Sequence, residues 1–278
     1  MQDGAAPEPA DHLVAGRPRE GTTVPLAVEA LAGGRPLRAV WKNELGGITF
    51  EIGSGATRSF VKWAPAGSGI DLAREATRLV WAADLTPVPR VLDQGTDDTG
   101  NWLVTAGLAG ESAATDRWKA DPVRAVDAIG RGLRALHEAL PVDTCPFSWS
   151  VEDRLADAHR RTAAGQLDPT RWHAIHQPIG VERALDLLAD APPPDKLVVC
   201  HGDACAPNTL LHSDGIWSGH VDLGALGIAD RWADLAIATW STNWNYGPGW
   251  EERLLTAYGI EPDDDRTRYY RLLWDLGP

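Results

Sequence analysis

The pattern of apolar and polar positions divides the chain into a strand-rich first part and a helix-rich second part. Short apolar runs separated by glycine-rich turns predict strands at residues 37–41, 48–52, 59–63 and 102–105. Residues 71–83 place apolar side chains at helical spacing. Residues 87–92 are expected to lead to a turn at 97–100. The first part should therefore be a small sheet with one helix.

The second part begins after residues 106–110, whose sequence AGLAG is typical of a flexible linker. Helices are predicted at residues 121–140, 151–164, 181–189, 229–239, 249–258 and 265–275, with a strand at 197–199. The first helix has clear ends, because Asp121 can cap it, Pro122 suits its first position and Pro141 follows it. This order predicts an α+β, two-lobe, protein-kinase-like fold. Its parts are a loose tail (1–23), an N-lobe (24–105), a hinge (106–110) and a C-lobe (111–278).

The most informative stretch is VVCHGDACAPN, residues 198–208, because it places Asp203 five residues before Asn208. Residues 209–212 and 216–222 are predicted to form a hairpin around a turn at 213–215. The hairpin would bring Asn208 beside Asp222, which is followed by Leu223 and Gly224. This spacing matches the catalytic loop of kinases, in which one carboxylate faces the attacking hydroxyl. An amide and a second carboxylate then hold magnesium on the nucleotide phosphates.

Lys62 lies inside a predicted strand with apolar neighbours, and a half-buried ammonium group needs a partner. Glu75, in the helix that follows, is the candidate. A strand lysine paired with a helix glutamate orients phosphates in kinases. An exposed lysine beside an exposed glutamate is the alternative, and the downstream motif favours the pair.

The turn NELGG, residues 43–47, has two interpretations. Gly46 and Gly47 can let backbone amides approach phosphates, or they can form a plain hairpin turn. Taken alone, the turn favours the second interpretation. No G-x-x-x-x-G-K-[ST] pattern occurs, which excludes a Walker-type loop.

The bulk composition narrows the class of partner. A net charge of −13 argues against nucleic acid and suits a cationic small substrate, or simply solubility. Three cysteines do not make a disulfide framework and fit a reducing cytoplasm. No apolar run has membrane-spanning length and the N-terminus does not resemble a signal peptide, so a cytoplasmic protein without a membrane partner is expected.

From about residue 39 onward, the chain resembles the aminoglycoside O-phosphotransferases, especially the 3′-type enzymes. The segments that carry the resemblance are residues 59–62, 87–92, 144–147, 198–208, 221–224, 229–236 and 269–273. The resemblance implies transfer of the γ-phosphoryl group of ATP, with Mg2+, to a hydroxyl of an aminoglycoside or related antibiotic. A monomer or weak dimer is expected.

The resemblance also implies roles for individual residues. Asp203 would be the base that faces the acceptor hydroxyl, and Asn208 and Asp222 would hold magnesium. Lys62 would contact the α and β phosphates and be held by Glu75. The other implied nucleotide contacts are backbone groups near Ala106 and Leu108, the side chain of Thr105, and the turn with Gly46 and Gly47. His201 would be structural.

The sequence departs from the family where the acceptor binds. Ala225 stands where the family often has arginine, and residues 170–175 carry no carboxylate where the family has an acidic loop. Asp275 is the one acid retained near the C-terminus. Tryptophans replace the acids, and they would form either a platform for a sugar ring or ordinary core; the candidates are Trp172, Trp240, Trp244 and Trp274. We therefore hypothesise an acceptor less cationic than kanamycin-like compounds.

Three alternatives stay open at this point. The first keeps the fold and makes the chain a kinase of a small metabolite, such as a sugar or an amino alcohol. The second is a metallo-hydrolase that uses His201, Asp203, Cys205 and His212, although no further ligand cluster is found. The third is a nucleotide-binding module without catalysis, against which the complete set of motif residues argues.

Overall fold

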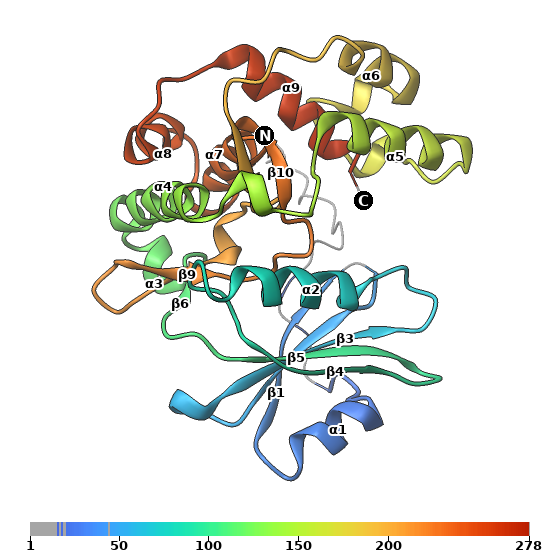
Figure 1. Cartoon of the computed structure of the whole chain (residues 1–278), viewed down its shortest axis with the longest axis vertical. Coiled ribbons are helices and arrows are strands. Elements are labelled where there is room, and N and C mark those ends of the chain that lie inside the picture. Colours follow the sequence, from blue (N-terminus) through green and yellow to red (C-terminus); the bar gives the residue numbers. More distant parts are fainter. Residues whose placement is uncertain (1–15, 17, 19–20, 44, 278) are drawn as a thin grey trace, which may run out of the picture. The chain divides into compact units, whose positions relative to one another are not determined.

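The structure is a computed structural model that describes residues 16, 18, 21–43 and 45–277 (Figure 1). The chain forms two compact units. The first consists of Met1–Ala73 and Val91–Gly107, and the second of Arg74–Arg90 and Leu108–Pro278. The division falls inside helix α2 (Leu72–Ala82), most of which therefore belongs to the second unit. The predicted tail, residues 1–23, lies almost wholly outside the described residues.

Within the described residues, the first unit contains a five-stranded antiparallel sheet of order β1-β2-β3-β5-β4. The strands are β1 (Leu37–Lys42), β2 (Ile48–Ile52), β3 (Ser59–Pro65), β4 (Val91–Thr96) and β5 (Gly100–Ala106). Four of them were predicted within a few residues. Strand β4 was not, because its sequence VLDQGT mixes polar residues and glycine and most of its positions are exposed. The turn predicted after it is present, since Asp97 N–H donates to the carbonyl of Gly100 (2.9 Å).

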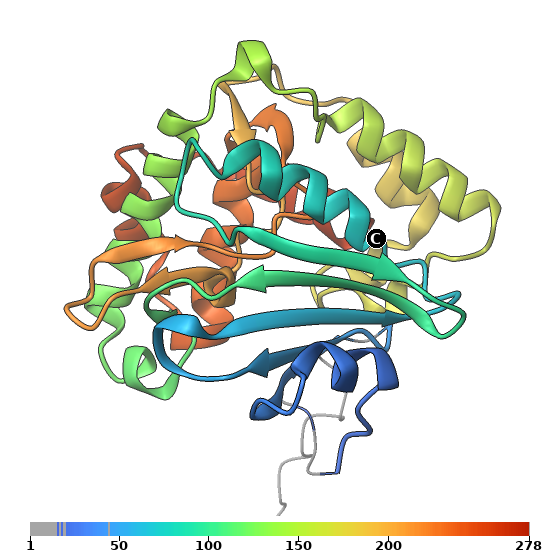
Figure 2. The same ribbon diagram turned by 60° about the horizontal axis from the view of Figure 1, so that its bottom comes forward.

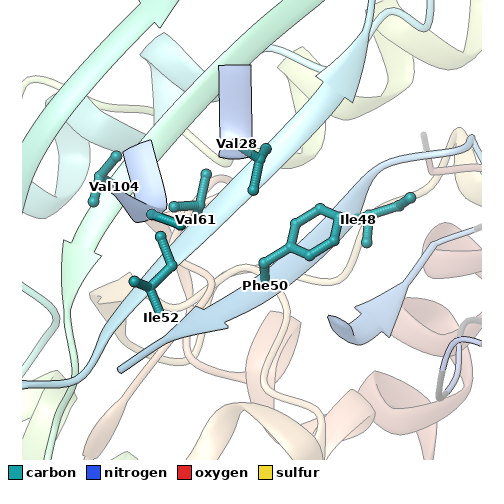
Figure 3. Packing of buried hydrophobic residues seen from close by; sticks show 7 residues of the cluster. Val28, Ile48, Phe50, Ile52, Val61 and Val104 are labelled. Atoms are coloured by element: carbon teal, nitrogen blue, oxygen red, sulfur yellow. The ribbon is translucent and has the colours of Figure 1, made fainter. Parts of the chain in front are cut away.

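Helix α1 (Leu26–Ala32), which the sequence pattern does not predict, covers one face of the sheet (Figure 2). Val28 of this helix packs with Phe50, Val61 and Val104 of the sheet (Figure 3). Alternate residues of β2 are buried, as a strand with one covered face requires. Seven residues are too few to show helical periodicity in a sequence, which explains the omission.

The second unit is mainly helical. After α2 come α3 (Asp116–Lys119), α4 (Pro122–Ala139), α5 (Val151–Ala163), α6 (Val181–Leu188), α7 (Trp232–Tyr246), α8 (Glu251–Tyr258) and α9 (Asp264–Asp275). Helix α4 packs against α8, and α7 packs against α8 and α9 (Figure 1). The predicted start of α4 is confirmed, because the Asp121 side chain accepts the backbone N–H of Arg124. Among the described residues, no helix is long and apolar enough to cross a membrane.

Two small antiparallel sheets complete the second unit. Strand β7 (Leu197–Cys200) pairs with β10 (Gly227–Asp230), and β8 (Thr209–Leu211) lies between β6 (Glu111–Ser112) and β9 (Trp217–His220). Single 3-10 turns occur at Gly55–Thr57 (η1), Val142–Thr144 (η2), Pro169–Arg171 (η3), Gln177–Ile179 (η4) and Ala206–Asn208 (η5).

One predicted helix boundary is wrong. Residues 229–239 were expected to be helical, but residues 229 and 230 end strand β10, and α7 runs from Trp232 to Tyr246. The Asp230 side chain accepts the backbone N–H of Trp232 (2.8 Å), which favours a helix start after the strand. The first eleven residues of α7 are all buried, so the helix lacks the one-sided pattern that would reveal its length.

Candidate active site

The loop after strand β7 is held by a buried carboxylate from helix α7. Asp234, which is fully buried, accepts the backbone N–H groups of His201 (2.6 Å) and Gly202 (2.9 Å). Its segment contributes to the family resemblance, but no pattern in the sequence predicts a role for Asp234. The partners lie more than thirty positions earlier, so no local pattern could have identified this contact.

Asp234 is in turn held by His137 of α4, whose Nε2–H donates to its Oδ2 (2.9 Å). The hydroxyl of Tyr258 in α8 donates to His137 Nδ1 (2.9 Å). Burial alone would raise the pKa of Asp234, but the hydrogen bond from His137, with help from the Gly202 amide, brings it below its ordinary value. Residues of three helices, α4, α7 and α8, thus hold the start of the loop that contains Asp203.

Gly202 shows how closely this loop lies against the segment after Asp222. Its φ is +84°, and a Cβ added there would be 2.3 Å from the carbonyl oxygen of Ala225. Both observations require glycine at this position. The loop with Asp203 and the turn with Asp222 are therefore in direct contact.

Asp203 is oriented by Asn208. The Nδ2 group of Asn208 donates to the Asp203 carbonyl (2.9 Å) and to its carboxylate Oδ2 (3.0 Å). The other carboxylate oxygen, Oδ1, is buried and accepts no hydrogen bond from the described residues. Burial, and then the charge of Asp222, raise the pKa of Asp203 above its ordinary value. The site therefore holds one carboxylate oxygen that lacks a donor.

The β8–β9 hairpin brings Asn208 and Asp222 together, as predicted. Thr209 pairs with His220, and Val221 N–H donates to the Asn208 carbonyl (3.0 Å). His201 reinforces the join: its Nδ1 accepts the N–H of Asp203 (3.2 Å), so its Nε2–H donates to the Val221 carbonyl (3.0 Å). His201 is thus a structural link between the two strand ends.

Asp222 has a φ of +66°, and it is the only non-glycine with a positive φ among the described residues. Backbone strain of this kind persists only where the surroundings enforce it, and it concentrates at functional sites. Here the enforcing contacts include those of the neighbouring Val221 with Asn208 and His201.

The oxygen atoms that Asn208 and Asp222 offer are of the kinds that bind magnesium. Asn208 uses its amide nitrogen on Asp203, so its amide oxygen is the atom it can offer to a cation. Asp222 adds a carboxylate, and hard cations such as Mg2+ prefer oxygen ligands of these two kinds. A cation would also offset the repulsion between Asp203 and Asp222, which raises the pKa of Asp203.

The residues proposed for a metallo-hydrolase do not form a metal site. Both ring nitrogens of His201 are engaged in hydrogen bonds, and His212 is exposed on a different strand end. Among the described residues, His137, Cys200 and Asp234 do lie close enough to share an ion. However, both nitrogens of His137 are hydrogen-bonded, and burial raises the pKa of the Cys200 thiol well above its ordinary value. This trio is a buried hydrogen-bonded cluster.

Helix α2 places Glu75 near the Asp222 turn. Glu75 is buried, and a Cβ added to Gly224 would be 3.8 Å from the Glu75 Cβ. Lys62 belongs to the first unit, where it lies half-buried on β3 between Thr49 and Leu103 of the neighbouring strands.

The other expected nucleotide contacts are divided between the units. Thr105 and Ala106 are half-buried at the end of β5 in the first unit, whereas Leu108 begins the main segment of the second unit. The turn at residues 43–47 uses its own amides. Asn43 Oδ1 accepts the N–H groups of Leu45 (3.1 Å) and Gly47 (2.7 Å), and its carbonyl accepts that of Gly46 (3.2 Å). Phosphate oxygens would have to compete with Asn43 for these donors.

The tryptophans proposed for acceptor binding differ in exposure. Trp172 and Trp240 are buried, Trp274 is half-buried, and Trp244 has 48% of its surface exposed. The Trp240 ring contacts the rings of His173 (4.4 Å between centroids, planes tilted by 44°) and Trp244 (5.3 Å, 39°). The buried ring of Trp240 therefore packs against the half-exposed indole of Trp244.

Asp275 is already paired inside the chain. Its Oδ2 contacts His176 Nδ1 (2.5 Å) and accepts the backbone N–H of His173 (3.2 Å), and its side chain is only 9% exposed. Helix α7, which carries Trp240 and Trp244, also contacts the loop that contains Asp203. Ser241 Oγ of this helix accepts the backbone N–H of Ala206 (2.8 Å).

A β-rich unit and a mainly helical unit that carries an Asp203–Asn208 loop and an Asp-Leu-Gly turn define a kinase-like phosphotransferase fold. The chain belongs to the phosphotransferase enzyme family APH, whose model matches residues 46–270. The predicted fold class and the resemblance are both confirmed.

The relatives are similar to this chain over most of its length. The aminoglycoside 3′-phosphotransferase of Streptomyces fradiae is 38% identical and covers 76% of this chain and 81% of its own length. The streptomycin 3″-kinase of Streptomyces griseus is 35% identical, and the match covers 84% of this chain and 89% of the kinase. A solved type VIII aminoglycoside-3′-phosphotransferase has a TM-score of 0.78 at 32% identity, covering 90% of this chain and 97% of that one.

Proposed function

We propose that this chain transfers the γ-phosphoryl group of ATP to a hydroxyl of an aminoglycoside antibiotic. Relatives named as aminoglycoside 3′-phosphotransferases and a streptomycin 3″-kinase support this activity over the phosphorylation of a small metabolite. One observation in the chain carries the proposal: the oriented Asp203 carboxylate has one oxygen without a hydrogen-bond donor.

In this proposal, the carboxylate of Asp203 receives the hydrogen bond of the acceptor hydroxyl. Asn208 holds the other carboxylate oxygen at 3.0 Å, so the carboxylate plane is set before the acceptor binds. Asp234 holds the backbone on the N-terminal side of Asp203 by accepting two amides. Such preorganisation aligns the hydroxyl for in-line attack and keeps its proton near a base.

The nucleotide would be bound with Mg2+. A magnesium ion supplies positive charge that offsets the charge on the transferring phosphoryl group. Asn208 would offer its amide oxygen and Asp222 its carboxylate to this ion. Lys62 would contact the α and β phosphates, as the family resemblance implies. A solved aminoglycoside phosphotransferase from Streptomyces rimosus, 31% identical and in complex with ADP and streptomycin, supports nucleotide binding.

The acceptor would lie against the exposed face of Trp244. Two carboxylates of this part of the chain are already paired, Asp275 with His176 and Glu251 with Arg271 (3.0 Å). This part of the site would therefore favour ring stacking over ion pairing. It supports the hypothesis of an acceptor with fewer charges than kanamycin.

The activity is tested by ADP release in a coupled assay with a panel of aminoglycosides, using wild type, Asp203→Ala and Asp222→Ala. We expect turnover to fall by about two or more orders of magnitude in both variants, because each removes a group that acts in the transition state. Asp203→Ala should still bind the nucleotide, and Asn208→Ala should lose less activity. Unchanged turnover in Asp222→Ala would remove its metal role, and no acceptor-dependent ADP release by wild type would refute the activity.

The acceptor hypothesis is tested by comparing kcat/KM for kanamycin, neomycin and streptomycin. We expect Trp244→Ala to raise the acceptor KM and to leave the KM for ATP unchanged, because only the ring surface is lost. Efficient phosphorylation of kanamycin and neomycin with micromolar KM values would refute a low-charge acceptor without affecting the phosphotransferase assignment.

A further inference from the structure

A buried arginine joins helix α2 to the turn that follows Asp222. Arg78 is only 7% exposed, and its Nε–H donates to the carbonyl of Leu226 (2.8 Å), 148 positions along the chain. Its Nη1 also donates to the carbonyl of Arg74, one turn earlier in the same helix (3.2 Å). One guanidinium group thus connects the helix to the turn at residues 223–226.

The guanidinium group also lies on an aromatic ring. It is 4.6 Å from the centroid of Phe147, and the Trp81 ring meets the same phenyl group edge-on at 5.8 Å. Cation–π contact is strong in a desolvated setting such as this one. The contact with Phe147 therefore holds the guanidinium group in the orientation in which its Nε–H donates to the Leu226 carbonyl.

Phe147 is not a mobile support. Its carbonyl accepts the N–H of Ile228 (2.9 Å), and the Ile228 carbonyl accepts the N–H of Trp149 (3.0 Å). Strand β10, which contains Ile228, begins directly after Leu226. The ring under Arg78 and the carbonyl that it holds thus belong to two segments of the chain that backbone hydrogen bonds join.

The turn that Arg78 holds is the one that supports Asp222. Leu226 N–H donates to the Leu223 carbonyl (3.0 Å) and closes residues 223–226 into a turn. The strained φ of Asp222 lies at the start of this turn and needs outside support. Glu75 lies three residues before Arg78, so both side chains lie on one face of α2, next to the turn.

We propose that Arg78 is a positioning residue that clamps helix α2 onto the turn after Asp222. The clamp would keep Glu75 and the Asp222 carboxylate, which would bind magnesium, at a fixed distance and orientation. This role toward magnesium rests on the proposed phosphotransferase function, whereas the clamp itself does not. Arg78 has no direct part in the chemistry. Its effect is to keep the strained conformation of Asp222 populated before nucleotide binds.

The first test uses the chain without nucleotide or metal. Hydrogen exchange followed by mass spectrometry should show faster exchange of peptides that cover residues 72–82 and 222–230 in Arg78→Ala than in wild type. Arg160→Ala is the matched control, because it makes the same change on an exposed face of α5. Equal exchange of residues 222–230 in wild type, Arg78→Ala and the control would overturn the clamp, whether or not the chain proves to be an enzyme.

The second test measures ADP release as magnesium is varied at saturating ATP. Loss of a buried charge-assisted hydrogen bond should raise the half-saturating magnesium concentration and lower kcat. The ratio of kcat to that concentration should fall by about tenfold or more. Arg78→Lys should recover part of this, since an ammonium group can reach the Leu226 carbonyl but cannot lie flat on Phe147. It also serves as the variant if Arg78→Ala does not fold.

A purely structural arginine would give a different result. In that case Arg78→Ala would lower the Tm while the magnesium requirement and kcat stayed at the values of Arg160→Ala, and the proposal would be wrong. Phe147→Leu keeps apolar volume but removes the ring, so it should shift the magnesium requirement in the same direction by less. The double variant should then show non-additive loss, because both side chains act through one contact.

Discussion

A carboxylate that is buried next to a second carboxylate is costly to keep charged, and Asp203 is in this position. Burial and the charge of Asp222 raise its pKa above the ordinary value of 3.8. The folded chain therefore binds this proton more tightly than the unfolded chain does. Stability must fall as pH rises from 3.8 to the raised pKa and stay lowered above it.

We therefore expect Asp203→Asn to raise the Tm at neutral pH while it abolishes turnover. Each kcal/mol recovered corresponds to about 2–4 °C for a chain of this size. The gain should vanish below pH 3.8, where the wild-type carboxyl is protonated in both states. Thermal unfolding without magnesium, measured from pH 3 to pH 8, checks this, with Asp98→Asn on an exposed turn as control. A lower Tm at neutral pH would contradict it.

Helices α4 and α8 approach so closely that one position between them excludes a methyl group. A Cβ on Gly130 of α4 would lie 2.6 Å from the Leu254 carbonyl and 2.8 Å from the Ala257 Cβ. The first of these is backbone and cannot move aside without shifting α8. This close approach matters for the site, because α4 supplies His137 and α8 supplies Tyr258 to the network that holds Asp234.

We expect Gly130→Ala to lower the free energy of unfolding by about 1–3 kcal/mol through overpacking. On an exposed helix the same change would instead stabilise the chain by about 1 kcal/mol, so the sign separates the two situations. Urea unfolding gives the measurement, with the exposed Arg131→Ala change on the same helix as control. A gain in stability would show that α8 can move away from α4.

The chain as a whole carries a net charge of −13, although Asp275 and Glu251 are paired with His176 and Arg271. Attraction of a cationic acceptor would then come from the long-range field more than from local ion pairs. Salt screens such a field, since the Debye length falls from about 30 Å at 0.01 M to about 3 Å at 1 M.

We therefore expect kcat/KM for a polycationic aminoglycoside to fall several-fold, on the order of 3–10 times, as salt rises from about 0.01 M to 0.5 M. The effect should be in kcat/KM, while kcat at saturation changes little. An acceptor with a single amine serves as control and should respond less. A salt-independent kcat/KM for the polycation would show that the net charge does not guide the acceptor.

The sequence by itself determined the order of strands and helices over most of the chain and the loop that carries Asp203 and Asn208. Those features are local: periodicity over a few turns, proline and glycine at element ends, and a short hairpin that joins Asn208 to Asp222. The family resemblance depended on the same short segments. The prediction of elements failed where local signals conflict, as in the polar strand β4 and the fully buried start of α7.

Only the tertiary structure decided which side chains hold that loop in place. Asp234 contacts amides 33 and 32 positions away, and Arg78 reaches a carbonyl 148 positions away. It also decided that Asp275 is paired with His176 and that Trp240 is buried while Trp244 is exposed. The physical reason is that hydrogen bonds and burial depend on which surfaces meet after the chain has packed, and a local pattern does not contain that information.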